Sequence, residues 1–206
     1  DLAEAHTVRG GIAANQANWE VAEKELKHAI ELNPNYATAH QYYSEYFYAV
    51  GTIDEARKHI DLAIELNPNS IIMYAFSSSL CYYDGDYIES LKKGDKVLEI
   101  DRNFRENNWI RFKSFIRLKK DSDAINVLHK ELSLETPGIN YKDSLLNIYS
   151  KSGINGILLW EIDRQLNRKD PSYHRIAAFY SLAGEKENAM DCLEKTYKVG
   201  PTHRLW

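Results

Sequence analysis

The sequence lacks several features by which the function of a protein is most often recognised. Only two of its 206 residues are cysteines, too few for a disulfide framework, and Cys81 and Cys192 do not have metal-site spacing. No stretch approaches the run of about 18 apolar residues that a membrane-spanning helix needs, so we expect this chain to make no membrane contact. The net charge of −4 is too small to draw the chain to nucleic acid or anionic membranes.

Motifs of catalysis and cofactor binding are also missing. The sequence has no Gly-rich phosphate loop, no nucleophile elbow and no His-Glu-x-x-His. Its histidines are scattered, and His6 and His40 stand at equivalent positions, which indicates structural analogues and not a ligand pair. The segment Asp84–Glu89 lacks the twelve-residue spread of ligands of a calcium loop, so we interpret it as a turn with Asp86 capping a helix. We therefore expect a protein that is not an enzyme, with no catalytic residues, metal, cofactor or small-molecule substrate.

An internal repeat is the main feature that the sequence does contain. The heptapeptide AIELNPN occurs at 29–35 and again at 63–69, and the shift from 29 to 63 defines the repeat step. The same step relates Gly51 to Gly85, and Pro34 to Pro68. Each unit reads as a helix, a turn with glycine, a second helix with apolar residues three or four apart, and Asn-Pro. Proline has no N–H with which to continue a helix, so each Asn-Pro ends one repeat and starts the next.

This pattern resembles the tetratricopeptide repeat (TPR), a helix-turn-helix unit of about 34 residues with small residues at fixed positions and a closing proline. The matching residues are Gly10, Ala22, Ala29 and Pro34 in the first repeat, and Ser44, Ala56, Ala63 and Pro68 in the second. The resemblance implies an all-α, right-handed TPR solenoid (an α-α superhelix) of about six repeats, with the whole chain as a single array. The predicted repeats span about 3–36, 37–70, 71–104, 105–138, 139–169 and 170–203.

The middle repeats depart from the pattern but keep its phase. Repeat three has Gly94 where the earlier repeats have large apolar residues, and repeat four has Lys119 in place of the turn glycine. Repeat five is shorter and has Leu158 at a position for a small residue, so we expect irregular curvature there, with Trp160 packed inside. Repeat six returns to the pattern and closes with Pro201.

The two ends of the chain indicate a segment of a longer protein. The opening DLAEAH aligns with NYATAH at 35–40, and the sequence stops shortly after Pro201, where a further helix would begin. A solenoid needs polar capping elements at its ends, and neither end of the sequence has one. We therefore expect further sequence outside this segment, and the uncapped ends also allow self-association.

Two phrases, at 18–56 and 183–197, resemble the C-terminal TPR part of bacterial winged-helix transcriptional regulators, and similar segments follow cyclase domains. The resemblance implies the interaction or sensor part of a bacterial signalling protein. Such a protein would be cytoplasmic, or periplasmic if the parent is a membrane-anchored regulator.

The strongest local charge asymmetry lies in Arg102–Lys120, which has seven Lys and Arg residues against one acid, Glu106. Basic residues interleaved with aromatics are typical of nucleic-acid surfaces, and this stretch is the alternative function that we consider. The preferred interpretation is an amphipathic TPR helix in which Phe112 and Phe115 pack inward while the basic residues line the solvated side. An acidic peptide partner is compatible with either interpretation.

TPR proteins usually hold a peptide or partner domain in the concave groove lined by the first helices of their repeats. The resemblance therefore implies a non-catalytic protein–protein interaction scaffold, and Tyr, Trp and Arg are the residue types most often found as interface anchors. The predicted partner-binding residues are Gln41, Glu45, Tyr48, Ser79, Tyr82, Tyr83, Trp109, Lys113, Arg117 and Asn147.

Overall fold

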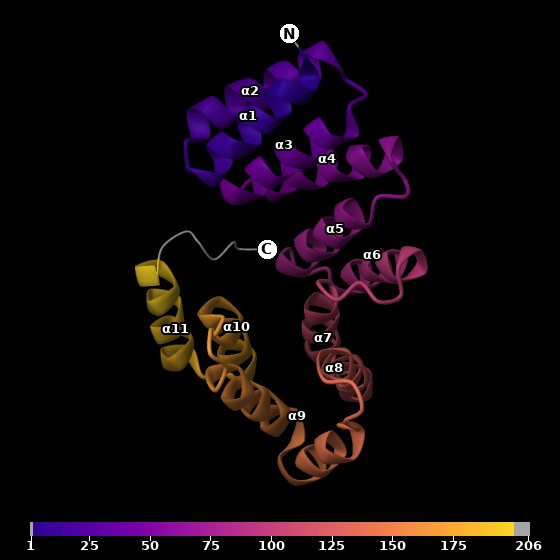
Figure 1. Ribbon diagram of the computed structural model, residues 1–206, viewed down its shortest axis with the longest axis vertical. Coiled ribbons are helices and arrows are strands. Elements are labelled where there is room, and N and C mark those ends of the chain that lie inside the picture. The colour runs from indigo at the N-terminus through magenta and orange to yellow at the C-terminus, as the bar shows by residue number, and fades with distance from the viewer. Residues whose placement is uncertain (1, 200–206) are drawn as a thin grey trace. The chain divides into compact units, whose positions relative to one another are not determined.

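The computed structural model describes residues 2–199, and every element in this part of the chain is an α-helix (Figure 1). The eleven helices found there, without a strand among them, confirm the predicted all-α fold. None of the described helices is both long enough and apolar enough to cross a membrane. The prediction for Pro201 falls outside the described residues.

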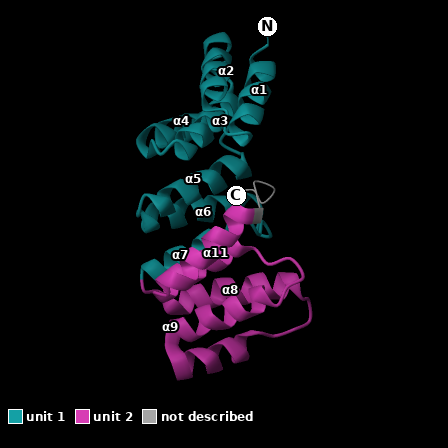
Figure 2. Cartoon of the chain, turned by 90° about the vertical axis from the view of Figure 1, so that its left-hand side faces the viewer, with its two compact units in different colours: residues 1–118 teal, residues 119–206 magenta. Residues whose placement is uncertain are grey.

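The chain divides into two compact units, residues 1–118 and 119–206 (Figure 2). The boundary falls within predicted repeat four, 105–138, and the prediction of a single array remains a prediction. In unit 1, α1 packs with α2, α3 with α4, and α5 with α6. Its helices are α1 (Ala3–Asn15), α2 (Trp19–Leu32), α3 (Ala37–Ala49), α4 (Ile53–Leu66), α5 (Ile71–Tyr83), α6 (Tyr87–Ile100) and α7 (Asn108–Arg117).

Unit 2 contains a helix that is broken in its middle. Its helices are α8 (Asp121–Glu135), α9 (Lys142–Leu166), α10 (Tyr173–Ala183) and α11 (Lys186–Val199). Within α9, Gly153 has φ 61° and ψ −160°, which interrupts the helical backbone. The two helices expected for repeat five are therefore the two arms of α9, joined at Gly153. Trp160 is only half-buried, with its ring 6.4 Å from that of Tyr141, so the expected inward packing is incomplete.

The turns between paired helices have the same backbone conformation in successive repeats. Gly51 and Gly85 have φ of 85° and 87°, in the left-handed region that glycine enters without steric cost. Ala17 and Lys119 occupy the equivalent positions and have φ of 56° and 58°. The turn geometry is therefore retained where the glycine is not. The turn predicted within Asp84–Glu89, with Asp86 as a helix cap, is also confirmed. Asp86 caps α6 by accepting a hydrogen bond from the Glu89 amide at 3.1 Å.

Small residues allow the two helices of a pair to approach closely. Ser44 on α3 donates to the carbonyl of Ala56 on α4 at 2.6 Å, and Ser78 on α5 donates to the carbonyl of Ser90 on α6 at 2.8 Å. All four residues are fully buried. The first repeat has Gly10 instead of a serine, and a Cβ there would lie 2.5 Å from Leu26 Cγ. The small residues predicted from the repeat are therefore the points at which the paired helices of unit 1 touch.

Candidate interaction surface

The first helices of repeats two and three meet through aromatic side chains of unit 1. The ring of Tyr48, on α3, lies 6.1 Å from that of Phe76 and 5.8 Å from that of Tyr83, both on α5. Tyr82 and Tyr83 are adjacent rings 5.3 Å apart. These four rings and Lys113 of α7 are called the aromatic–lysine cluster below. The cluster draws on three of the first helices, and three of the four rings are predicted residues.

Lys113 is held between two tyrosines of the cluster. Its Nζ lies 4.6 Å from the ring centroid of Tyr82 and 5.3 Å from that of Tyr83, and only 8% of the residue is exposed. A cation this close to two ring faces is attracted by their electrons, and the attraction is larger where water is excluded. The cluster therefore presents positive charge embedded in an aromatic surface.

The tyrosine hydroxyls of the cluster stay neutral at physiological pH. Burial raises the pKa of Tyr82, and a hydrogen bond with Arg117 of α7 opposes part of that rise. Partial burial, followed by the neighbouring Tyr48 and Tyr82, raises the pKa of Tyr83 to about 12. Tyr83 is nevertheless an exposed ring of the cluster. A neutral hydroxyl can both donate and accept hydrogen bonds, so the surface offers apolar, cationic and hydrogen-bonding groups together.

The remaining predicted residues of α3 and α5 make local contacts. Gln41 Nε2 donates to Glu45 Oε1 at 2.9 Å, and burial raises the pKa of the Glu45 carboxyl. Ser79 donates to the carbonyl of Ala75 at 3.1 Å, within its own helix. Glu45 is thus a partly buried acid on the helix that also carries Tyr48.

The two remaining predicted residues, Trp109 and Asn147, lie on α7 and α9. Trp109, on α7, is half-buried with its ring 6.2 Å from that of Phe112. Asn147 belongs to unit 2, where it is exposed on α9. The prediction also missed Phe76, although it precedes Ser79 and Tyr83 by three and seven residues. That spacing places all three on one side of a helix, so the sequence contained the signal.

We predicted that the basic side chains of Arg102–Lys120 face solvent, and this was wrong for two of them. Lys113 is buried in the cluster, and Arg111 is ion-paired with Asp95 of α6 while lying 5.7 Å from the ring centroid of Phe115. The reason is that α7 packs against both α5 and α6, so two of its sides are covered. Phe112 is fully buried, as predicted, whereas Phe115 is only partly covered.

The histidines at equivalent positions pair with other side chains and not with each other. His6 Nδ1 lies 2.6 Å from Glu25 Oε2, and one repeat later His40 Nδ1 lies 2.9 Å from His59 Nδ1. His40 Nε2 also lies 2.9 Å from the Pro34 carbonyl oxygen, which can only accept. In neutral His40 the proton is therefore on Nε2, and His59 is the donor to His40 Nδ1.

These pairs shift two pKa values and form no metal site. The hydrogen bond with His6 lowers the pKa of Glu25, against the opposing effect of its burial. Burial, followed by the neighbouring His40, lowers the pKa of His59. Among the described residues there is no group of three His, Cys, Asp or Glu side chains that could hold a metal ion.

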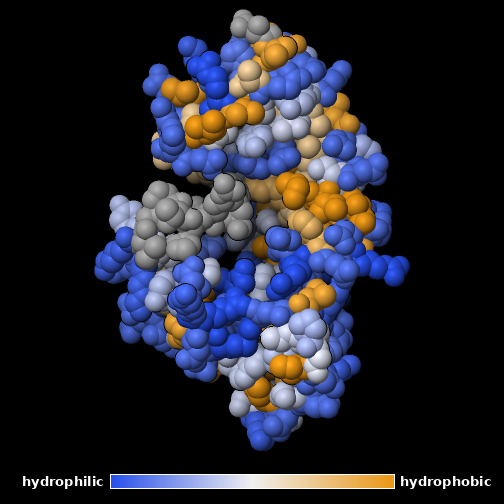
Figure 3. Space-filling view, in the orientation of Figure 1, coloured by the Kyte–Doolittle hydropathy of each residue, from blue (hydrophilic) through white to orange (hydrophobic). Residues whose placement is uncertain are grey.

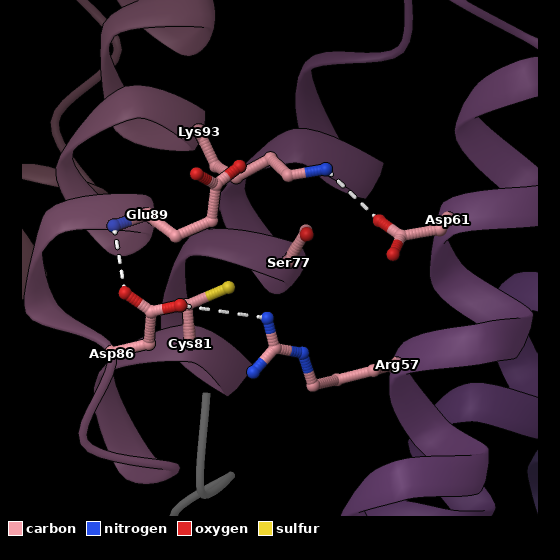
Figure 4. Close-up of a pocket in the computed structure, with 7 residues that line it drawn as sticks. All are labelled: Arg57, Asp61, Ser77, Cys81, Asp86, Glu89 and Lys93. Carbon is pink, nitrogen blue, oxygen red and sulfur yellow. Dashed lines mark hydrogen bonds and ion pairs between the residues drawn. The ribbon is translucent and has the colours of Figure 1, made fainter.

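A polar cavity of about 250 Å³ lies between α4, α5 and α6 (Figure 4). Lys93 pairs with Asp61 at 2.9 Å, and Arg57 pairs with Asp84 and, at 3.7 Å, with Asp86. These ion pairs join helices of repeats two and three across the cavity. Cys81 lines the cavity, and burial raises the pKa of its thiol to about 11, which keeps it protonated and weakly nucleophilic.

Unit 2 has its own buried charge network. Glu161 is fully buried and accepts hydrogen bonds from Gln165 at 2.6 Å and from Arg164 at 2.7 Å. Arg164 also pairs with Glu135 of α8 at 2.7 Å, and burial lowers the pKa of Arg175. Removing one partner of a buried ion pair of this kind is costly, so we assign the network a structural role.

Comparison with known proteins supports the TPR resemblance. Residues 170–202 match the family model TPR_8, described as tetratricopeptide repeat. This is predicted repeat six, where the small residues and the turn glycine return. A comparison with curated proteins gave no match.

Solved structures match the fold over nearly the whole chain. A tetratricopeptide repeat protein from Parabacteroides merdae ATCC 43184 has a TM-score of 0.71 at 15% identity, covering 96% of this chain and 78% of its own. PilW, a type IV pilus biogenesis factor, has a TM-score of 0.67 at 14% identity, with coverage of 98% and 95%. YrrB, a TPR protein with an unusual peptide-binding site, has a TM-score of 0.55 at 13% identity, with coverage of 94% and 84%.

Proposed function

We propose that this TPR fold is an interaction scaffold and that its unit 1 binds a peptide segment of a partner protein on the aromatic–lysine cluster. The observation that carries the proposal is Lys113, buried at 8% exposure against Tyr82 and Tyr83. A scaffold helix needs no such arrangement for its own packing, because the equivalent positions of a repeat can be filled by apolar residues at lower desolvation cost.

The chemistry of the cluster suggests the kind of peptide. The exposed ring of Tyr83 and the half-buried rings of Tyr48 and Tyr82 provide contact area with little loss of side-chain freedom. Lys113 with Arg117 favours acidic groups. The apolar surface visible over α5 in Figure 3 would add contacts for aliphatic side chains. We therefore infer a peptide that combines acidic and apolar residues. YrrB has the same fold and a peptide-binding site, which makes the mode of binding plausible for this fold.

The test is selection of binding peptides from a random display library, followed by affinity measurement on purified protein. We expect peptides with acidic and apolar residues to be enriched, and Tyr83→Ala to weaken their binding at least tenfold. The matched control is Ile88→Ala, since Ile88 is also an exposed large apolar residue but lies on α6, outside the cluster. Selected peptides that bind Tyr83→Ala as tightly as the original chain would contradict the proposal.

The nucleic-acid alternative is less well supported by the described contacts. Arg111 of the basic stretch is already ion-paired with Asp95, which leaves one cation fewer for phosphates. Binding of a single-stranded oligonucleotide that weakens steeply with salt would favour this alternative over the peptide.

A finer proposal is that the chain is the interaction or sensor part of a cytoplasmic bacterial regulatory protein. It rests on the phrases at 18–56 and 183–197 alone. Sequencing of the parent gene tests it. A winged-helix or cyclase domain in the same open reading frame is the expected result, and a gene that encodes neither would contradict the proposal.

A further inference from the structure

The helix α1 has an apolar side that no other described residue covers. Leu2, Val8 and Ile12 are exposed large hydrophobic residues, with Ile12 at 53%, and Ala5 lies between them. Ala5, Val8 and Ile12 follow helical spacing, and Leu2 is the extended N-cap residue just before the helix. We call these four residues the head face. Hydrophobic surface is visible at the end of unit 1 that holds α1 and α2 (Figure 3). The opposite side of α1 is buried in the usual way within unit 1.

The repeat itself shows what covers such a face. The positions one repeat after Ala5 and Ile12 are Ala39 and Tyr46 of α3, and both are buried. The hydroxyl of Tyr46 donates to Glu23 of α2, so the face is turned toward the preceding repeat.

The next repeat shows the same arrangement in apolar residues. The positions after one further repeat are Met73 and Leu80 of α5, and both are buried in one core cluster with Ile60 and Ile64 of α4. In repeats two and three, the equivalents of Ala5 and Ile12 are therefore buried, on the side that faces the second helix of the repeat before.

The last described helix has the complementary side. Met190, Leu193 and Tyr197 of α11 are exposed, Tyr197 at 89%, and we call them the tail face. When the small residue Ala189 is aligned with Ala56, Leu193 and Tyr197 correspond to Ile60 and Ile64. These are the residues of α4 that bury Met73 and Leu80 of the following repeat. No described residue covers the tail face in this way.

We propose that copies of this chain associate head to tail, with the tail face of one copy on the head face of the next. The occupant is a second copy because the chain itself carries both halves of an ordinary repeat junction. The side chains also fit, since the pair equivalent to Glu23 and Tyr46 is Met190 and Ile12, which are both apolar. The two surfaces differ, so the contact is heterologous and does not close at a dimer.

The test is sedimentation velocity of the whole chain over a wide concentration range, with one variant blocking each face. We expect the original chain to form species of increasing size as its concentration rises. Ile12→Lys and Leu193→Lys should each remain monomeric, because a charge cannot be buried there without a partner. Mixed in equal amounts, they should form a 1:1 dimer and nothing larger, because each retains one usable face.

The matched control is Ile88→Lys, which places a charge at a residue of α6 that is 61% exposed and outside both faces. It should assemble like the original chain. Circular dichroism checks that each variant keeps its helices, and Met190→Lys replaces Leu193→Lys if the latter unfolds. A chain that is monomeric at every concentration would overturn the proposal. Loss of assembly in Ile12→Lys but in neither tail variant would also overturn it, because the head face would then pair with itself.

Discussion

Lys119 adopts the same left-handed turn conformation as Gly85, its equivalent in the preceding repeat, with φ of 58° against 87°. A side chain with a Cβ is strained in this region, by about 1–2 kcal/mol. The turn is therefore imposed by the two helices that it joins, and the sequence tolerates a residue that does not favour it.

We predict that Lys119→Gly stabilises the protein. Glycine relieves the left-handed strain but adds freedom to the unfolded chain, so we expect a net gain of roughly 0.5–1 kcal/mol in the free energy of unfolding. Urea denaturation followed by circular dichroism measures it. Lys120→Gly is the control, since Lys120 has φ −99° and no strain to relieve. A Lys119→Gly variant no more stable than the original would contradict the prediction.

A second prediction concerns the hydroxyl of Ser44, which donates to the buried carbonyl of Ala56 at 2.6 Å. Ser44→Ala removes this hydrogen bond between α3 and α4 and should lower the free energy of unfolding by about 1 kcal/mol. Ser79→Ala serves as control because Ser79 bonds only within its own helix, and its effect should stay within about 0.5 kcal/mol. Equal changes in the free energy of unfolding would show that the interhelical hydrogen bond stabilises the protein no more than a hydrogen bond within one helix.

The close approach of Gly10 to Leu26 leads to a third prediction. A Cβ at position 10 would lie 2.5 Å from Leu26 Cγ and 3.2 Å from the Leu26 backbone nitrogen, and the backbone cannot move aside easily. Gly10→Ala should therefore destabilise the protein by about 1–3 kcal/mol, although alanine normally favours a helix.

A double-mutant cycle tests whether Leu26 is the cause. In a Leu26→Ala background, Gly10→Ala should cost clearly less than it does in the original chain, because the obstructing Cγ is gone. Both free energies come from urea denaturation. Costs that simply add would mean that the clash lies elsewhere.

The fourth prediction is a loss of stability in mild acid. The pKa of His59 is lower in the folded chain than its ordinary value of 6.5, so the folded state binds the proton less readily than the unfolded state does. This contribution is fully present above pH 6.5 and is lost as the pH falls through the lowered pKa.

Free energies of unfolding at pH 7.5, 6.5 and 5.5 measure this effect. His59→Gln retains an N–H that can donate to His40 but does not titrate, so its free energy of unfolding should fall less between pH 6.5 and 5.5. The lowered pKa of Glu25 acts in the same direction at more acidic pH, below its ordinary 4.5. Identical pH dependence of the variant and the original chain would contradict the prediction.

The helix pairs and their turns could be predicted because the interactions that determine them are local. Asp86 caps α6 from three residues away, and Ser90 and Ala124 are buried at positions counted from Ala56. The resemblance to TPRs added which helices line the candidate surface, and Tyr48, Tyr82 and Tyr83 do lie together. The peptide selection with Tyr83→Ala tests whether they bind a partner.

The contacts between distant segments could not be predicted from the sequence. Lys113 looks like one more cation of a basic helix, and its burial depends on tyrosines of α5, far earlier in the chain. Arg111 is covered for the same reason, by Asp95 of α6. The pairing of His40 with His59 also escaped notice, because equivalent positions suggested a comparison with His6 and not with a partner on the next helix.

By itself, then, the sequence determined the repeat period, the helix–turn–helix unit and the small residues at which paired helices touch. These features follow from helical spacing, glycine turns and proline, which act over a few residues. Only the tertiary structure decided which cations are buried against tyrosines, how the histidines pair and which apolar residues of α1 and α11 stay exposed. Those outcomes depend on what lies across an interhelical contact, and neighbours along the chain carry no information about it.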